Sequence, residues 1–400
     1  MSDMSIGRRG LLAAGGATAL ATGLGAVASP ASAAPASGKV PAGGVAPSTL
    51  RFRRDGGFTV LQFNDTQDGP KVDKRTIQLI ETAAKKVRPD LIVLVGDNTN
   101  GDAKTWEEHK QAINNIASTF ESTGIPWAVT FGNHDEDSTP TSGMDEAKQL
   151  AFYMKYGNNL NVAGPKGVTG TGNMYLPIRS SKGKHDAYGI WMIDSGRYAP
   201  KTMAGQDFEG YPTWDWVRMD QVDWYYRLSE QLEAQRRRKV PSYLFQHIAL
   251  WEYRFMWWGG VDGRTDADHQ RGLKRHGIVG QRNEDECPGP FNSGLFNAII
   301  ARGETEGVSI GHDHINTYHG DYYGVTLAYG PGSGYGTYGL KGAEKNHLRG
   351  GRVFQFKEDA KGVGRLAETY NVFAKDYGID VTEADQTREP RALPVWAKKV

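Results

Sequence analysis

Between residues 58 and 135 the chain alternates short apolar segments with longer amphipathic ones, and this alternation limits the folds open to it. The apolar segments have the length and composition of buried strands. The amphipathic segments space their apolar residues near 3.6 and therefore predict helices. Such an order indicates parallel strands in a layered α/β domain. The expected strands are 58–65, 91–98 and 125–135, and the expected helices are 71–90 and 106–123.

The second half of the chain predicts further strands, each followed by a polar loop. No internal repeat of fixed period is present, and no linker divides residues 50–370. We therefore expect one domain over residues 51–370. The charged, proline-bearing tail at 371–400 is expected to lie on the surface. The later strands are predicted at 187–196, 241–250, 307–314 and 324–334, with a helix at 220–238.

The N-terminal segment, residues 1–33, has the pattern of an export signal. Arg8 and Arg9 precede an apolar run rich in Ala and Gly, and the small residues 31–33 fit a cleavage site. The paired arginines resemble a twin-arginine signal, so we expect a secreted, periplasmic or cell-wall protein. The run has few Leu and Ile residues, which favours cleavage over a retained membrane anchor, the alternative. Residues 34–50 are rich in Pro, Ala, Gly and Ser, and predict a flexible linker.

Charge and cysteine content exclude several functions. The chain has 47 Lys and Arg against 46 Asp and Glu, a net charge of +1. No general positive field exists to hold nucleic acid, so a generic nucleic-acid binder is not expected. Cys287 is the only cysteine, which excludes an intramolecular disulfide and a cysteine-based metal cluster.

Five of the expected strands end in side chains that can bind a metal ion. Alone, each has another reading, since the motif at 132–135 suits a turn and His247 suits a buried core position. Ligands in open α/β sheets bind at the carboxyl ends of strands. The joint occurrence of these residues therefore predicts one metal-binding pocket. They are Asp65, Asp97, Asn133 with His134, His247, and His312 with His314.

These motifs resemble the calcineurin-like metallophosphoesterase superfamily over most of residues 57–355. Flanking stretches such as DSGRY and FNSGLF are similar to the subgroup related to purple acid phosphatases. The resemblance implies a four-layer α/β/β/α sandwich, with two mixed sheets flanked by helices. The matching pieces are FNDTQ, VGDNTNG, FGNHDE, QHIAL and GHDHIN.

The resemblance also implies a ligand set for two metal ions. Asp97 would bridge the ions, and Asp65 and His314 would complete one site. The other site would be completed by Asn133, His247 and His312. Mixed oxygen and nitrogen ligands suit Mn, Fe or Zn. In the family, a water activated between two ions attacks phosphorus.

The resemblance also leads to expectations for the pair His134 and Asp135, and for Gln67. By the resemblance, His134 contacts the phosphate or protonates the leaving group, and Asp135 orients its ring; a structural turn is the alternative. The family usually has His where this chain has Gln67. An amide oxygen is neutral and less basic than imidazole, so the first site should be weaker, differently selective, or completed by water.

The resulting hypothesis is an exported dinuclear phosphoesterase with a small phosphorylated substrate, and the subgroup favours monoesters. Alternatives are a phosphodiesterase acting on nucleotides or phospholipid head groups, and a one-metal, non-catalytic phosphate-binding protein. Export and aromatic content leave open a carbohydrate-binding surface protein. The aromatic stretch at 251–260 suits either a wall of the substrate entrance or ordinary packing.

Overall fold

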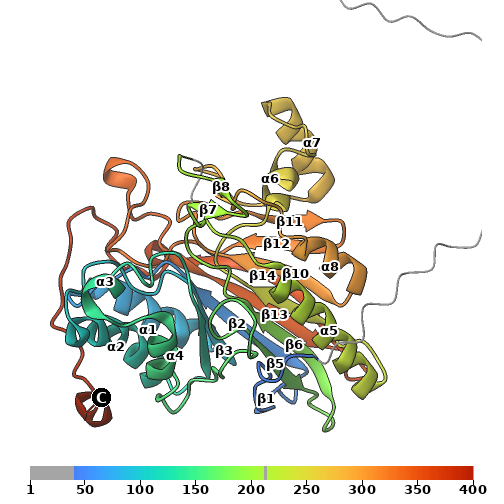
Figure 1. Cartoon of the computed structure of the whole chain (residues 1–400), viewed down its shortest axis with the longest axis horizontal. Coiled ribbons are helices and arrows are strands. Elements are labelled where there is room, and N and C mark those ends of the chain that lie inside the picture. The colour runs from blue at the N-terminus through green and yellow to red at the C-terminus, as the bar shows by residue number, and fades with distance from the viewer. Residues whose placement is uncertain (1–39, 211–213, 400) are drawn as a thin grey trace, which may run out of the picture. The chain divides into compact units, whose positions relative to one another are not determined.

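The computed structural model describes residues 40–210 and 214–399, so the predicted export signal lies outside it. Its first sheet has five strands in the order β14-β13-β2-β3-β4 (Figure 1). Strands β2, β3 and β4 are parallel, and β13 pairs antiparallel with both β2 and β14. The strands are β2 (Gly57–Phe63), β3 (Leu91–Val95), β4 (Trp127–Thr130), β13 (Gly350–Glu358) and β14 (Gly364–Phe373).

The second sheet has seven strands in the order β1-β5-β6-β9-β10-β12-β11. Strands β6, β9, β10 and β12 are parallel, whereas β5 pairs antiparallel with β6 and β11 pairs antiparallel with β12. At the edge, β1 pairs parallel with β5. Both sheets are therefore mixed. The strands are β1 (Leu50–Arg51), β5 (Met174–Arg179), β6 (Asp186–Met192), β9 (Ser242–Phe245), β10 (Thr305–Ile310), β11 (His319–Tyr322) and β12 (Val325–Tyr329).

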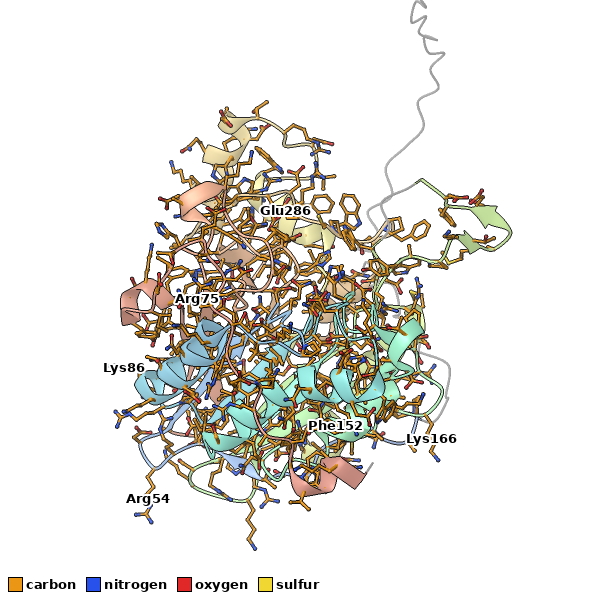
Figure 2. All side chains as sticks on the ribbon, turned by 90° about the vertical axis from the view of Figure 1, so that its left-hand side faces the viewer. Arg54, Arg75, Lys86, Phe152, Lys166 and Glu286 are labelled. Carbon is orange, nitrogen blue, oxygen red and sulfur yellow. The ribbon has the colours of Figure 1, made fainter. Side chains whose placement is uncertain are left out.

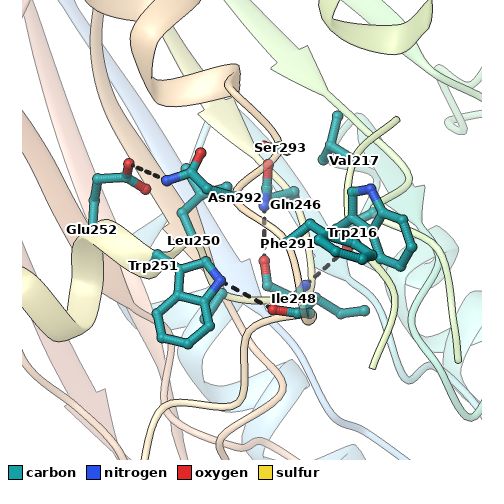
Figure 3. Close-up of a pocket in the computed structure, with 13 residues that line it drawn as sticks. Trp216, Val217, Gln246, Ile248, Leu250, Trp251, Glu252, Phe291, Asn292 and Ser293 are labelled. Atoms are coloured by element: carbon teal, nitrogen blue, oxygen red, sulfur yellow. Dashed lines mark hydrogen bonds between the residues drawn. The ribbon is translucent and has the colours of Figure 1, made fainter. Parts of the chain in front are cut away.

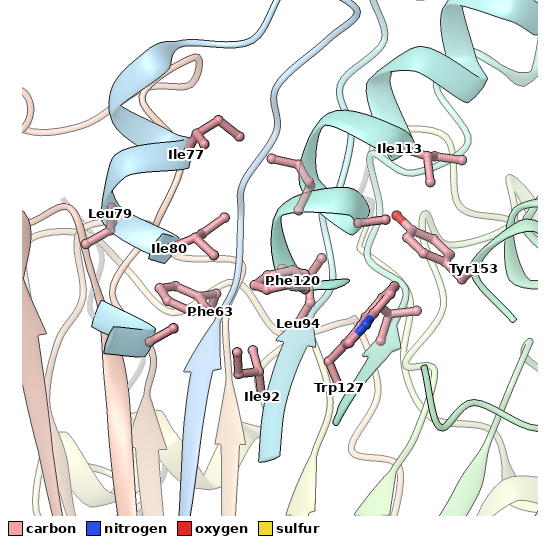
Figure 4. Packing of buried hydrophobic residues seen from close by; sticks show 14 of the residues in the cluster. Phe63, Ile77, Leu79, Ile80, Ile92, Leu94, Ile113, Phe120, Trp127 and Tyr153 are labelled. Atoms are coloured by element: carbon pink, nitrogen blue, oxygen red, sulfur yellow. The ribbon is translucent and has the colours of Figure 1, made fainter. Parts of the chain in front are cut away.

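Helices cover the outer face of each sheet. On the five-stranded sheet, Phe120 of α2 (Trp106–Ser122) and Ile80 of α1 (Lys74–Val87) pack over Phe63 and Leu94 (Figure 4). The seven-stranded sheet is covered mainly by α5 and α8. The remaining elements are α3 (Thr139–Ser142), α4 (Glu146–Tyr153), β7 (Thr202–Met203), β8 (Gln206–Asp207), α5 (Met219–Arg236), α6 (Trp251–Trp257), α7 (Asp266–His276), α8 (Leu295–Arg302), and the 3-10 turns η1 (Gly342–Glu344), η2 (Ala374–Tyr377) and η3 (Val395–Lys399).

The two sheets face each other across a shared apolar core. Val93 and Phe354 of one sheet and Ile190 and Phe245 of the other belong to it, and all four are fully buried. Strands buried on both faces need continuous apolar sequences, which is why 91–95 has no polar residue. The α/β/β/α sandwich with two mixed sheets is confirmed. Within the described residues, no helix is both long and apolar enough to cross a bilayer.

The predicted flexible linker does not extend to residue 50. The Ala46 amide donates to Tyr175 O at 3.0 Å, and the Gly44 amide donates to Ala163 O at 3.3 Å. Ala46 is only 4% exposed. Residues 40–50 thus pack beside β5, and the prediction is wrong for them because their backbone groups find partners there. Residues 34–39 lie outside the described part of the chain.

The predicted C-terminal tail begins inside a strand, because β14 continues to Phe373. Beyond it the chain crosses α1 and α2, and most of its residues are exposed, as expected for a surface segment. It is nevertheless docked: the Lys74 amide donates to Gln386 O at 2.8 Å. At its end the Trp396 ring lies 5.0 Å from Phe152 and 5.1 Å from Tyr156.

This docking predicts that Trp396→Ala destabilises the domain. Loss of a partly buried indole should cost about 2 kcal/mol of the free energy of unfolding. Val395→Ala is the matched control, since Val395 is 73% exposed. Urea denaturation measures both variants, and equal unfolding free energies for the two would show that the tail does not contribute.

Candidate metal centre

The predicted ligands occupy loops at the carboxyl ends of five strands. Asp65, Asp97 and Asn133 follow the parallel strands β2, β3 and β4 of one sheet. His247 and His312 follow β9 and β10 of the facing sheet, and His314 lies two residues further on. All six side chains are buried. The centre is therefore built at the edge where the two sheets meet.

Three of these residues form a first group, with ligand atoms of Asp97, His247 and His312 within 4.8 Å of one another. His247 Nε2 lies 3.2 Å from Asp97 Oδ2. The other ring nitrogen, Nδ1, lies 2.9 Å from Val95 O and must donate to it, because a carbonyl only accepts. This bond fixes the tautomer and leaves the Nε2 lone pair facing the pocket, as in metal-binding histidines.

The second group consists of Asp65, Asp97 and His314, again within 4.8 Å. His314 Nε2 lies 3.4 Å from Asp65 Oδ1. Asp97 belongs to both groups, as a carboxylate that bridges two ions must. The structure thus brings these predicted ligands together around one shared carboxylate.

Unpaired polar atoms show that the pocket suits metal ions. Both amide atoms of Asn133, and Nε2 of His312, are buried without a hydrogen-bond partner among the described residues. Such groups are rare because leaving them unpaired costs free energy. The Asn133 backbone lies close to the first group, since a Cβ on its neighbour Gly132 would lie 2.4 Å from Asp97 Oδ1. Carboxylate, amide and imidazole donors in this arrangement fit a metal site.

The backbone is strained at the same positions. Asp65, Asp97 and His312 adopt left-handed φ values of 50°, 52° and 74°, and Gln67 has a φ of 31°. Non-glycine residues with such values cost of order 1–3 kcal/mol each and persist only where the surroundings enforce them. The strain aims these side chains into the pocket immediately after their strands.

Gln67 lies beside the shared carboxylate. Its Nε2 donates to Asp97 Oδ2 at 3.2 Å, while its Oε1 is buried and has no partner in the part of the chain that the structure describes. The side chain thus occupies the pocket with one oxygen available, so that it can act as a neutral ligand.

Burial and neighbouring charges set the ionisation of the pocket. Burial alone would raise the pKa of Asp97, but the adjacent imidazole of His247 holds it below its ordinary value. Burial lowers the pKa of His312 to about 3, so that ring is neutral and can coordinate through a lone pair. Burial would lower the pKa of His247, but the adjacent Asp97 carboxylate raises it to about 10. Protons and metal ions therefore compete for His247.

The ring of His134 contacts Asp137, so the expectation that Asp135 orients it is wrong. His134 Nδ1 lies 2.5 Å from Asp137 Oδ2. The Asp135 carboxylate instead accepts backbone amides of Asn98 at 2.8 Å and Gly132 at 2.8 Å. Asp135 is fully buried and holds the two loops together, and its oxygens are occupied there.

Two residues of the DSGRY stretch complete the surroundings of His134. Arg197 donates to Glu136, Asp137 and the Asn133 carbonyl, at 3.0, 3.0 and 3.2 Å. The Tyr198 hydroxyl lies 3.4 Å from His134 Nδ1. Sequence reasoning assigned no role to these residues or to Asp137. The acidic residues directly after His134 were the only local signal.

Hydrogen bonds of the residues on either side of His247 hold its loop in place (Figure 3). The Ile248 amide donates to Ser195 Oγ at 2.9 Å, and Gln246 Nε2 donates to Ile248 O at 2.8 Å. The cavity among these residues measures about 10 Å³, room for one water and not for a substrate. The aromatic stretch at 251–260 largely packs inward, since Tyr253 and Met256 are fully buried. It therefore belongs mainly to the core of the domain.

The fold and the donor set together define a metal-binding phosphoesterase, a hydrolase of phosphoric esters. The family profile of the calcineurin-like phosphoesterases matches residues 58–316, more than half of the sequence. The chain belongs to this family.

Two relatives from Arabidopsis thaliana align with most of this chain. It is 30% identical over 325 residues to "Probable inactive purple acid phosphatase 14", covering 73% of this chain and 74% of the relative. It is 29% identical over 330 residues to "Probable inactive purple acid phosphatase 29", covering 74% and 77%. Among solved structures, a dimetal phosphatase from Danio rerio superposes with a TM-score of 0.41 at 11% identity, covering 79% of this chain and 99% of that one.

Because Gln67 contacts the shared carboxylate of Asp97, we predict that Gln67→His strengthens metal binding at this centre. A basic imidazole in place of a neutral amide should slow removal of the ion by a chelator roughly tenfold. Gln355→His is the matched control, because Gln355 pairs with Thr59 at the opposite end of β2. Metal content after timed chelation, measured by plasma mass spectrometry, is the readout. Equal retention by Gln67→His and the wild type would contradict the assignment.

Proposed function

We propose that this chain is an exported phosphoesterase that hydrolyses small phosphate esters at a dinuclear metal centre, with monoesters favoured over diesters. The observation that carries the proposal is the position of Asp97. It is shared by two groups of buried ligands, one completed by His247 and His312 and one by Asp65 and His314. A site with a single ion would have no use for the second group.

We assign one ion to each of the two groups of ligands. Asp65, Asp97 and His314 would hold one, with the Gln67 oxygen beside it. Asp97, Asn133, His247 and His312 would hold the other. Mn, Fe and Zn suit such mixed donors. When bound, such a pair supplies Lewis acidity at phosphorus and a nucleophilic water at neutral pH.

His134 is the residue placed to handle a proton. Its side chain is 36% exposed, whereas all six ligands are buried, so it can reach a bound ester from the open side. Burial acts to lower its pKa, but the bond to Asp137 and the nearby Asp97 raise it above the ordinary value. The ring can thus carry the proton that a departing alkoxide needs.

A non-catalytic phosphate-binding protein is the second candidate, and Gln67 is the observation that favours it. The names of the two plant relatives also describe those proteins as probably inactive. The paired His134 and Asp137 support the enzyme, because a scaffold that only binds phosphate does not need an oriented proton donor beside its ligands.

Export and partners belong to the same proposal. The twin-arginine-type segment at residues 1–33 supports secretion, or a periplasmic or cell-wall location, without a stable membrane anchor. The nearly neutral charge supports a small phosphorylated substrate over nucleic acid.

The proposal predicts that His134→Ala abolishes turnover and keeps the metal. With Mn, Fe or Zn supplied, kcat on phenyl phosphate should fall roughly 100-fold or more, because the leaving oxygen loses its proton donor, and kcat on p-nitrophenyl phosphate, a better leaving group, should fall less. Metal content should equal that of the wild type. His185→Ala, in the turn before β6, is the control and should keep full activity.

A wild type that hydrolyses none of p-nitrophenyl phosphate, bis-p-nitrophenyl phosphate, nucleotides and phospholipid head-group esters, with its metals bound, would refute the enzyme. Retained turnover in His134→Ala would refute the role of that ring. The ratio of the two nitrophenyl substrates decides between monoesterase and diesterase.

The contacts of the two neighbouring carboxylates predict opposite outcomes for their amides. Asp137→Asn should lower kcat roughly tenfold with little change in melting temperature, because the amide oxygen can still accept from Arg197 and Tyr198 but no longer carries the charge that stabilises the protonated His134 ring. The loss should be larger for phenyl phosphate, a poorer leaving group, than for p-nitrophenyl phosphate. Asp135→Asn places an amide against backbone N–H groups and should cost about 2 kcal/mol of unfolding free energy. If Asp135→Asn instead lowered kcat and Asp137→Asn lowered the unfolding free energy, Asp135 would be the residue that orients His134.

A further inference from the structure

The loop after β6 and the segment before α5 meet beside the metal centre. Tyr198 and Trp214 pair as an isolated antiparallel bridge, and the Asp215 amide donates to Arg197 O at 3.1 Å. The β7–β8 hairpin leaves the domain between these two residues and extends away from the sheets (Figure 2). Because the bridge fixes both backbones, Tyr198 and Trp214 are presented side by side.

Their rings span the distance between the candidate proton donor and a metal ligand. The Tyr198 ring lies 5.8 Å from the Trp214 ring at 32°, and 6.4 Å from His134 at 85°. The Trp214 ring lies 4.6 Å from His312 at 85°. Tyr198 and Trp214 therefore form a continuous aromatic wall beside His134 and the metal ligand His312.

Tyr198 is anchored at its polar end and open along its ring. Its hydroxyl donates to Asp137 Oδ1 at 3.3 Å, and the guanidinium of Arg197 lies 5.4 Å from the ring centroid. The residue is still 37% exposed. An exposed aromatic held in one orientation beside a reactive centre provides contact area at little entropic cost.

The charge beside the wall is already neutralised. Asp137 is paired with Arg197 at 3.0 Å and with His134 at 2.5 Å. Glu136 is also paired with Arg197, at 3.0 Å. The wall therefore offers ring faces without an unpaired carboxylate, which favours a flat neutral group over a cation.

We propose that Tyr198 and Trp214 form a subsite for the ester group of the substrate, and that this chain selects phosphate esters whose alcohol carries an aromatic ring. An ester oxygen that leaves toward His134 places its carbon substituent against the wall. Stacking there orients the bond that breaks. This inference rests on the proposed function, because the phosphoryl group must be held at the metal centre.

The first arm compares substrates whose alcohols are about equally poor leaving groups, so that reactivity does not bias the result. The metal-loaded protein should hydrolyse 2-phenylethyl phosphate with a kcat/KM roughly tenfold above that for butyl phosphate. Trp214→Leu, which keeps apolar bulk and removes the ring, should reduce this ratio to near one. Tyr323→Leu is the control: Tyr323 is 65% exposed in the β11–β12 turn, at the strand end opposite the ligands, and should leave the ratio unchanged.

The second arm needs no turnover. Benzylphosphonate should bind the metal-loaded protein roughly tenfold more tightly than propylphosphonate by calorimetry, and Trp214→Leu should remove the difference. Should the variant not fold, the wild-type affinity ratio alone still tests the subsite.

The two arms separate the two proposals. Tighter binding of benzylphosphonate without hydrolysis of either ester would support the subsite and reject the enzyme. Hydrolysis of both esters at equal kcat/KM, with equal phosphonate affinities, would overturn the subsite and support the enzyme. A preference for phosphocholine over 2-phenylethyl phosphate that Trp214→Leu abolishes would also overturn it, because the wall would then bind a cation.

Discussion

The site depends on one buried carboxylate, that of Asp97. Burying an unpaired charge costs several kcal/mol, so its contacts have to be dense. Oδ1 accepts the His134 amide at 2.8 Å, and Oδ2 accepts the Gln67 amide at 3.2 Å and lies 3.2 Å from His247. These contacts come from the loops after β2, β4 and β9. The loop that carries the general-acid candidate is therefore positioned by the same group that is shared between the two ligand sets.

This arrangement means that both sheets contribute ligands to the centre. Asp65, Asp97 and Asn133 belong to the five-stranded sheet, and His247 and His312 to the seven-stranded one. The apolar core between the sheets sets their separation and offsets the left-handed strain at the loop ends. Metal ions bound between ligands of the two sheets would add their binding free energy to the stability of the fold. Binding of metal would therefore couple the stability of the fold to its metal content.

The sequence pattern predicted a layered α/β domain and the meeting of the ligands because both depend on local patterns, whereas the four-layer arrangement came from the family resemblance. Apolar segments such as 91–95 define strands, and the strand ends fix where Asp97 and its counterparts lie. The contact between His134 and Asp137 could not be predicted, because Asp135 and Asp137 both lie within three residues of His134 and only the loop geometry decides which carboxylate meets the ring. The aromatic wall was missed for a similar reason, since Tyr198 and Trp214 meet across a hairpin.

If two ions bind as proposed, the amide of Gln67 in place of an imidazole would make their positions chemically unequal. One position is offered the carboxylates of Asp65 and Asp97, one imidazole and a neutral amide oxygen. The other is offered one carboxylate, one amide and the imidazoles of His247 and His312. Oxygen-rich sites prefer harder ions such as Mn, whereas imidazole-rich sites suit Zn and Fe. In the proposed centre, the amide would therefore shift the metal preference of the position beside Gln67, and two different ions could share the Asp97 carboxylate.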